Sequence, residues 1–280
     1  MFLIVLLPYF SSDLIAQYKR NKNYNDPFTK TQRWLGFRAG TNLTKAIPIE
    51  RFSSFSPINY QSTDVGKEYN GYTGPGLQAG LEFTFYTQGF SISIQPTFTR
   101  QFFSYSTSYK WDDPANQQNS LDLKYEINND LEYLDFPLII KYDLMRTKAR
   151  PFLQIGGYYG MLLSAAKTLN SSGIDRASGA ESSFENEEIR VGAGDLFTTS
   201  SAGLIAGAGV AVRQGNIRLV FDVNYRHGLN NITNTKNRYK DDRLASIGEV
   251  MDDMNLRSIW ISFGAQFPLK FISKDYEAID

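Results

Sequence analysis

Residues 131–144, LEYLDFPLIIKYDL, decide the fold class of this chain. From Leu134 to Tyr142 every second residue is large and apolar. The positions between them carry two opposite charges and a proline: Tyr133, Asp135, Pro137, Ile139 and Lys141. A period of two is the period of a β-strand. The stretch therefore predicts a strand with one apolar and one polar face, and it leaves open whether a protein core or a lipid bilayer covers the apolar face.

The same alternation recurs along the chain and predicts eight strands. Short turns at 86–90, 143–151 and 213–216 alternate with long polar connections at 45–74, 107–120, 167–198 and 230–254. Tight turns on one edge and long loops on the other are typical of outer-membrane barrels, and an even strand number places both chain ends on the short-turn, periplasmic side. The predicted strands lie near residues 33–44, 75–86, 90–106, 131–144 (extended back toward Leu121), 151–166, 199–213, 216–229 and 255–269.

Strand length favours lipid over a protein core. The alternation from Phe90 to Phe98 covers nine residues, and a transmembrane strand needs about 9–11. Strands of globular proteins are most often about 5–6 residues long. A soluble, lipocalin-like carrier would have to place all the Phe, Leu and Ile rows in an interior only just wide enough for side chains. We therefore expect an all-β, eight-stranded antiparallel up-and-down transmembrane β-barrel over residues 33–271, located in the cell outer membrane with membrane lipid as its main partner.

The polar register of the predicted strands carries charges. In a narrow barrel these side chains face the lumen, where opposite charges can pair. The lumen should then be too filled to conduct ions. Prolines at positions 96 and 137 remove backbone donors, so a local bulge is expected at each. Aromatic residues at 85, 90, 142 and 267 lie near the short-turn ends, where one interfacial girdle is expected. The predicted lumen charge network consists of Arg38, Glu82, Asp135, Lys141, Arg218, Asp222 and Arg226.

The N-terminus predicts export across a membrane. Residues 1–16 begin with an apolar run and end at a small-residue step before Gln17, which is typical of a secretory signal peptide. The alternative is a short buried strand or helix. A membrane-spanning helix needs about 20 apolar residues, which this run does not reach. Residues 17–32 are then a periplasmic N-terminal segment, and residues 272–280 form a C-terminal tail.

Composition argues against several kinds of chemistry. The chain of 280 residues has no cysteine and one histidine, which argues against disulfides, thiolate sites and a histidine-based metal centre. Its 29 basic and 29 acidic side chains balance, so no nucleic-acid partner is predicted. The mean hydropathy of −0.34 is compatible with a membrane barrel, because only alternate strand residues face lipid.

The chain resembles PorT-like outer-membrane barrels over most of residues 34–271. The resemblance rests on YLDFPLIIKYDL (133–144), on the hairpin GLIAGAGVAVRQGNIRLVFDVNYRHGLNNI (203–232) and on the last strand, NLRSIWISFGAQFPL (255–269). It implies an eight-stranded barrel with a blocked lumen and no catalytic residues. It also implies an accessory or anchor role in type IX-like protein secretion or surface assembly, with secretion or envelope proteins contacted through the long outer loops.

No residue of the sequence is predicted to be catalytic, cofactor-binding or metal-binding. His227 could serve as a general base in an outer-membrane enzyme, but Asp222 falls on the opposite register, so a rim residue is the favoured interpretation. Clustered carboxylates at 112–120 and 240–255 allow loop calcium binding, although solvated loops are favoured, the second with a short amphipathic helix. The glycines at 207–215 lack the strand–turn–helix context of a nucleotide-binding loop, so they are expected to relieve crowding in the lumen.

Overall fold

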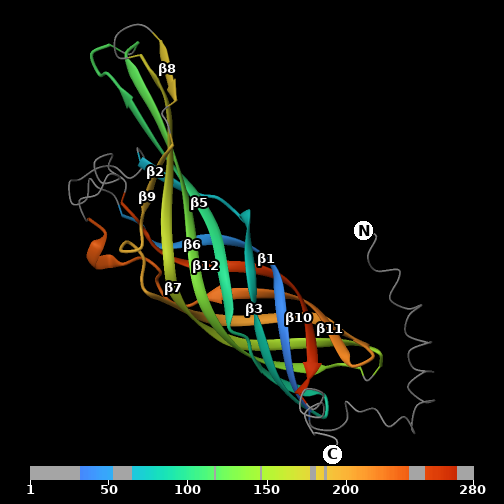
Figure 1. Cartoon of the computed structure of the whole chain (residues 1–280). Coiled ribbons are helices and arrows are strands. Elements are labelled where there is room, and N and C mark those ends of the chain that lie inside the picture. The colour runs from blue at the N-terminus through green and yellow to red at the C-terminus, as the bar shows by residue number, and fades with distance from the viewer. Residues whose placement is uncertain are drawn as a thin grey trace, which may run out of the picture.

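The computed structural model, described for residues 32–52, 65–116, 118–145, 147–176, 181–185, 188–239 and 250–269, is an antiparallel barrel (Figure 1). No helix within these ranges is long and apolar enough to cross a membrane. A short 3-10 helix, η2, spans Thr235–Asn237. The strands are β1 (Gln32–Glu50), β2 (Val65–Tyr69), β3 (Thr73–Thr87), β4 (Phe90–Ile94), β5 (Thr97–Asp112), β6 (Ser120–Asp143), β7 (Ala149–Asp175), β8 (Ser182–Glu185), β9 (Ile189–Gly192), β10 (Ser200–Gln214), β11 (Ile217–Gly228) and β12 (Asp253–Pro268).

The strands close into a ring, which confirms the predicted eight-stranded barrel. The order around the ring is β1, β3, β4 with β5, β6, β7, β10, β11 and β12, and β12 pairs again with β1. Here β4 and β5 act as one interrupted strand, because both pair with β3 on one side and β6 on the other. Trp34 lies opposite Pro268, so the start of β1 and the end of β12 lie side by side at the short-turn edge of the barrel.

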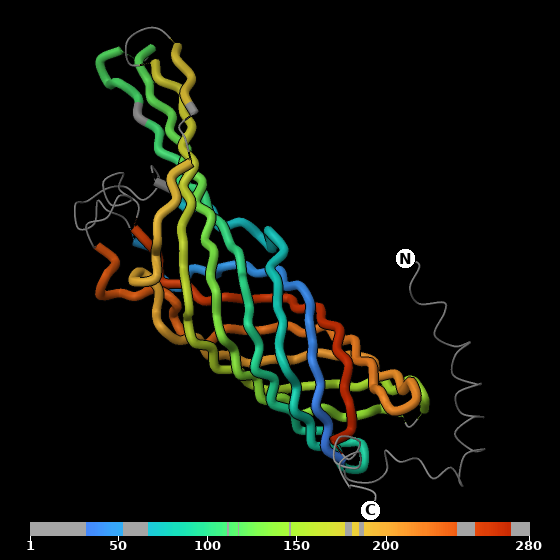
Figure 2. Tube along the Cα trace, in the orientation of Figure 1, coloured from blue at the N-terminus to red at the C-terminus, as the bar shows by residue number. Residues whose placement is uncertain are grey.

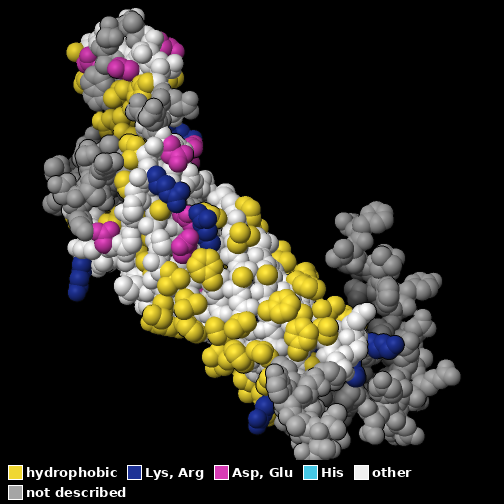
Figure 3. All heavy atoms as spheres, viewed as in Figure 1, with side chains coloured by type: hydrophobic (Ala, Val, Ile, Leu, Met, Phe, Trp, Pro, Cys, Tyr) yellow, Lys and Arg dark blue, Asp and Glu magenta, His cyan; other side chains and the backbone are white. Residues whose placement is uncertain are grey.

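The apolar rows face outward and the polar rows face inward. On β6, Leu138 and Ile140 are 56% and 48% exposed, whereas Asp135, on the other register of the same strand, is 1% exposed. Hydrophobic side chains cover the middle of the barrel surface, and charged side chains gather beyond this band (Figure 3). A soluble carrier would need the reverse arrangement, so the lipocalin-like alternative is wrong.

The two strand prolines do not produce the expected bulges. The ladder is interrupted at Gln95 and Pro96, but pairing resumes in the same register, since Ile94 lies opposite Leu138 and Thr97 opposite Asp135. The amide of Gln95 donates to the carbonyl of Pro137 at 3.0 Å. Proline lacks an N–H group and cannot donate to the ladder. The strand formed by β4 and β5 is therefore interrupted at residues 95 and 96, but no extra residue is inserted as in a bulge. The register shift of β6 lies at Glu132/Tyr133, away from the proline.

Two of the predicted outer loops are largely strand, which corrects the sequence prediction. β6 and β7 contain 24 and 27 residues, more than twice the roughly 9–11 residues that cross a membrane. Residues 104–112 of β5, 120–128 of β6 and 168–175 of β7 continue the ladder outward, and β8 pairs with this end of β7. We call these residues the outer extension; it rises well beyond the barrel in Figure 2.

Several predictions concern residues outside the described ranges. They are the signal peptide at 1–16, most of the segment 17–32, the tail at 272–280 and most of the helix expected near 240–255. Within the described part, β1 begins at Gln32, one residue before the predicted barrel start.

Candidate functional site

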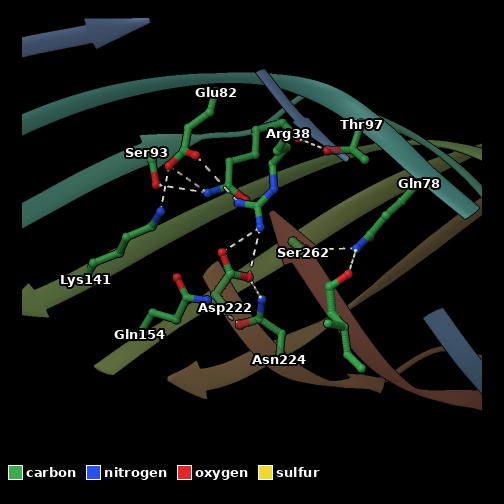
Figure 4. A network of polar contacts seen from close by, with 12 residues as sticks. Arg38, Gln78, Glu82, Ser93, Thr97, Lys141, Gln154, Asp222, Asn224 and Ser262 are labelled. Atoms are coloured by element: carbon green, nitrogen blue, oxygen red, sulfur yellow. Dashed lines mark hydrogen bonds and ion pairs between the residues drawn. The ribbon is translucent and has the colours of Figure 1, made fainter. Parts of the chain in front are cut away.

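The barrel lumen holds a chain of ion pairs. Lys141 Nζ on β6 contacts Glu82 Oε1 on β3 at 2.6 Å, and Arg38 Nη1 on β1 lies 3.7 Å from Glu82 Oε2. The Nη2 group of Arg38 donates to both carboxylate oxygens of Asp222 on β11, at 2.9 and 2.8 Å. Figure 4 shows these side chains converging from opposite walls of the barrel. The chain therefore crosslinks four strands through the lumen.

Neutral side chains add further hydrogen bonds to the carboxylates of this network. Thr84 and Gln95 each donate to Glu82 Oε1 at 3.1 Å. Asn224 donates to Asp222 Oδ1 at 2.6 Å. Buried charges are tolerated when they are paired and hydrogen-bonded. Glu82 and Asp222 are thus both paired with a basic group and hydrogen-bonded by neutral side chains.

A second ion pair lies toward the outer end of the lumen. Arg226 Nη1 contacts Asp135 Oδ2 at 2.7 Å. The guanidinium carbon of Arg226 lies 3.3 Å from the Trp260 ring centroid and 4.4 Å from that of Tyr158. The planar guanidinium suits such stacking while it pairs with a carboxylate. Arg226 therefore occupies the width of the lumen at this level.

A third group lies at the periplasmic end, and two of its members, Asp143 and Arg150, were missed by the sequence analysis. Asp143 Oδ1 is 3.3 Å from Arg218 Nη2, and Asp143 Oδ2 is 3.7 Å from Arg150 Nη1. Arg150 also donates to the hydroxyl of Tyr86 at 3.0 Å. Asp143 and Arg150 lie within the predicted short connection 143–151, yet both are buried and continue the inward register of β6 and β7. Following the period of two to the strand ends would have found both.

An apolar cluster closes the outer end of the lumen. We call it the outer plug: segments 193–198, 230–234 and 250–252 pack against strand residues inside the barrel. Phe197 and Thr233 form a β-bridge, and the amide of Ile232 donates to the carbonyl of Met254 at 2.9 Å. The buried members of the cluster are Ala46, Phe103, Tyr105, Ile127, Leu131, Tyr133, Ala165, Leu169, Ala193, Leu196, Phe197, Ile232, Met251, Met254 and Leu256.

One buried carboxylate fastens the outer plug to the barrel rim. Asp252 accepts hydrogen bonds from the amide of Phe52 at 2.8 Å, from Lys67 Nζ at 2.9 Å and from the Tyr69 hydroxyl at 2.8 Å. The Thr233 hydroxyl donates to the carbonyl of Asp252 at 2.6 Å. Four segments distant in sequence therefore meet at one residue.

All seven residues of the predicted lumen network are buried in the barrel interior, and each forms an ion pair. His227 lies on the outward register instead, opposite Leu204 and Arg257. Asp222 lies on the opposite register, as predicted; it points into the lumen and accepts a hydrogen bond from Arg38. A catalytic pair of His227 and Asp222 is therefore excluded by the strand geometry.

The acidic connection after β5 folds on itself. The carboxylate of Asp113 accepts hydrogen bonds from the amide of Ala115 at 2.8 Å and from the side chain of Asn119 at 3.3 Å. These hydrogen bonds lower the pKa of Asp113 from its usual value. In the described part of the chain, no group of three or more His, Cys, Asp and Glu residues is arranged to hold a metal ion.

Comparison with known proteins agrees with this architecture. The family model of the outer membrane protein beta-barrel domain matches residues 15–234. The chain belongs to this family. The outer membrane is therefore its location, with the apolar rows facing lipid. No curated protein sequence matches the chain.

Solved structures similar to this family member include three bacterial proteins. Ail, the attachment invasion locus protein of Yersinia pestis, is 10% identical with a TM-score of 0.34, covering 84% of this chain and 99% of its own. OprG from Pseudomonas aeruginosa is 14% identical with a TM-score of 0.38, covering 86% and 98%. Neisserial surface protein A is 14% identical with a TM-score of 0.30, covering 85% and 98%.

Proposed function

We propose that this protein is a non-conducting outer-membrane anchor of PorT-like type, an accessory component in type IX-like protein secretion or surface assembly. The observation that carries the proposal is the combination of a filled lumen with strands that continue far beyond the membrane. A channel would need an open path, whereas ion pairs and the outer plug occupy this lumen. The material beyond the membrane is instead built as a sheet.

The outer extension supports a role in contact with other envelope proteins. Its ladder runs without a register shift from Leu121 opposite Asp175 to Glu132 opposite Ser164. An open groove of about 1030 Å³ lies along it. Residues of both charge signs line this groove, among them Glu68, Lys110, Asp122 and Lys124. A rigid, charged sheet held above the membrane can bind a partner with little loss of conformational entropy.

Conductance separates this proposal from a pore. We expect the folded protein in planar lipid bilayers to show no stepwise single-channel current. Reproducible, voltage-independent channel openings from heat-modifiable, correctly folded protein would contradict a non-conducting role.

Partner contact is tested by site-specific photocrosslinking in cells. A photoreactive residue in place of Lys124, which is exposed on the outer extension, should give crosslinks to secretion or envelope proteins. The matched control replaces Ile155, which is 63% exposed on the lipid face, and should give no such crosslinks. Identical patterns from both positions, or undiminished surface display of secreted proteins in cells lacking the chain, would refute the proposal.

The enzyme alternative built on His227 is not proposed. The imidazole lies on the outward face of β11, two positions from Tyr225, which is 41% exposed toward the membrane. No carboxylate in the described ranges forms an ion pair with it.

A further inference from the structure

β2 is an edge strand at the base of the outer extension. Within the described ranges it forms a ladder with β5 alone, from Val65 opposite Tyr109 to Tyr69 opposite Tyr105. Figure 1 shows β2 beside the place where the outer extension leaves the barrel. A strand with a single ladder has fewer hydrogen bonds to break when it opens. β2 can therefore move while β5, β6 and β7 keep their pairing.

The two faces of β2 contact different parts of the molecule. Successive side chains of a strand point to opposite faces. Glu68 is exposed and lines the groove on the outer extension, as does Lys124 of β6. Lys67 and Tyr69 point the other way, and the Tyr69 ring lies 5.1 Å from the ring of Tyr105 in the apolar cluster of the outer plug. One five-residue strand thus connects the groove with the outer plug.

The inward face of β2 is held through Asp252 of the outer plug. Lys67 Nζ and the Tyr69 hydroxyl donate to different oxygens of this carboxylate, at 2.9 and 2.8 Å, and we call these contacts the latch. Lys67 Nζ also donates to the carbonyls of Phe52, at 3.2 Å, and of Val250. The side chains of Lys67 and Asp252 are 9% and 0% exposed. Separation of such a pair leaves a buried charge without a partner, so the latch is either closed or fully open.

The outer plug depends on the same carboxylate-bearing residue. The hydroxyl of Thr233 donates to the carbonyl of Asp252 at 2.6 Å. The side-chain oxygen of Asn231 accepts hydrogen bonds from the amides of Thr233 and Met254, each at 3.0 Å. Ile232 and Met254 belong to the buried apolar cluster and are 1% and 0% exposed. Movement of Asp252 therefore disturbs the segments that close the outer end of the lumen.

We propose that β2 couples the groove to the outer plug. A partner that binds Glu68 and moves β2 away from Asp252 opens the latch, and the apolar cluster of the outer plug then loosens. Coupling between two sites is reciprocal, so a change that opens the latch from the plug side also loosens β2. The inference rests on the proposed contact of the outer extension with an envelope protein, but the coupling belongs to the chain itself and is measured without that protein.

The first test opens the latch and measures β2 and the outer plug together. Hydrogen exchange of the folded, full-length protein in lipid nanodiscs is followed by mass spectrometry. In Asp252→Asn the charge of Lys67 is left buried and unpaired, so the amides of residues 65–69 and 230–234 should both exchange at least about tenfold faster. Tyr69→Phe removes a single hydrogen bond of the latch, and both segments should exchange about threefold faster.

The control for this test is Arg100→Gln, which removes an ion pair of a 40% exposed arginine on the same rim. It should leave the exchange of both segments within about twofold of the wild type. Faster exchange of residues 230–234 with unchanged exchange of β2, in both latch variants, overturns the proposal, because Asp252 would then hold the plug without coupling it to the strand.

The second test perturbs the groove and measures the outer plug. The chain has no cysteine, so one introduced cysteine carries a bulky maleimide at a single known position. A label on Glu68→Cys should speed the exchange of residues 230–234 about tenfold, which lies in the usual range of coupling between sites. A label on Asn128→Cys, exposed on β6 outside the groove, should leave it within about twofold. Equal exchange in the two labelled proteins overturns the proposal.

The coupling and the proposed function fail separately. Absence of protein crosslinks from position 124 would refute the partner contact without changing these exchange rates. Unchanged exchange in the latch and label variants would refute the coupling without affecting the crosslinks. Heat-modifiable gel migration of every variant verifies that the barrel is folded.

Discussion

Arg38 shows at the scale of one residue why the lumen charges are interdependent. Its guanidinium is 7% exposed and joins two carboxylates from different strands. Removal of one partner from a buried ion pair leaves an uncompensated charge, which costs about 3–5 kcal/mol. Replacement of a whole pair by apolar groups is often neutral. Replacing a single member of the network should therefore destabilise the barrel more than replacing a whole ion pair.

We predict that Arg38→Met lowers the free energy of unfolding by about 3–5 kcal/mol. The measurement is urea unfolding of the barrel refolded into lipid vesicles. Arg100→Met is the control: that arginine also pairs with an aspartate, but it is 40% exposed, so its loss should cost only about 0–1 kcal/mol. Equal losses in the two variants would mean that the lumen is as well hydrated as the rim.

Within a strand, glycines that face the filled lumen allow neighbouring backbone and side chains to pack closely against them. A Cβ atom added at Gly207 on β10 would overlap the carbonyl oxygen of Val223 and the side chain of Asn224. At Gly157 on β7 the nearest atom is the carbonyl oxygen of Gly203, at 3.4 Å. Overpacking of a filled interior costs about 1–3 kcal/mol. The two glycines should thus respond differently to the same substitution.

We predict that Gly207→Ala destabilises the barrel by about 1–3 kcal/mol, because backbone must move. Gly157→Ala should change stability by less than about 0.5 kcal/mol, because the added methyl group would point to lipid. Unfolding midpoints in the same vesicle assay compare the two. A neutral Gly207→Ala would show that β10 and β11 can separate without cost.

The sequence predicted the ring of strands well and their outer ends poorly. Alternation is strong where one face meets lipid, so the apolar rows around Phe90 and Tyr142 were sufficient to orient the barrel. The outer extension is rich in serine and charged residues, which suits a segment surrounded by water. Such segments carry weak local strand signals, and their pairing with residues 120–128 of β6 decides their conformation. Asp143 and Arg150 were missed for a different reason: they lie at the strand ends, within the connection predicted at 143–151, where the alternation was not followed.

The molecule as a whole has two regions that share strands but have different solvents. The barrel turns its apolar rows to hydrocarbon, and the outer extension stands in water on the same β5, β6 and β7 (Figure 1). Exposure alone does not distinguish them, since Ile155 is 63% exposed on the barrel and Ile189 is 36% exposed on β9. The solvent that meets each side chain is what differs, and a charge introduced at each site reports it.

We predict that Ile155→Arg lowers the stability of the inserted barrel by about 2–4 kcal/mol, the cost of a basic residue near the bilayer midplane. Ile189→Arg, in the outer extension's neighbour β9, should change it by less than about 0.5 kcal/mol, as expected for a surface site in water. Folding into vesicles is followed by heat-modifiable gel migration and urea titration. If both arginines were tolerated equally, water rather than hydrocarbon would contact β7 at Ile155, and the outward apolar rows would need another explanation.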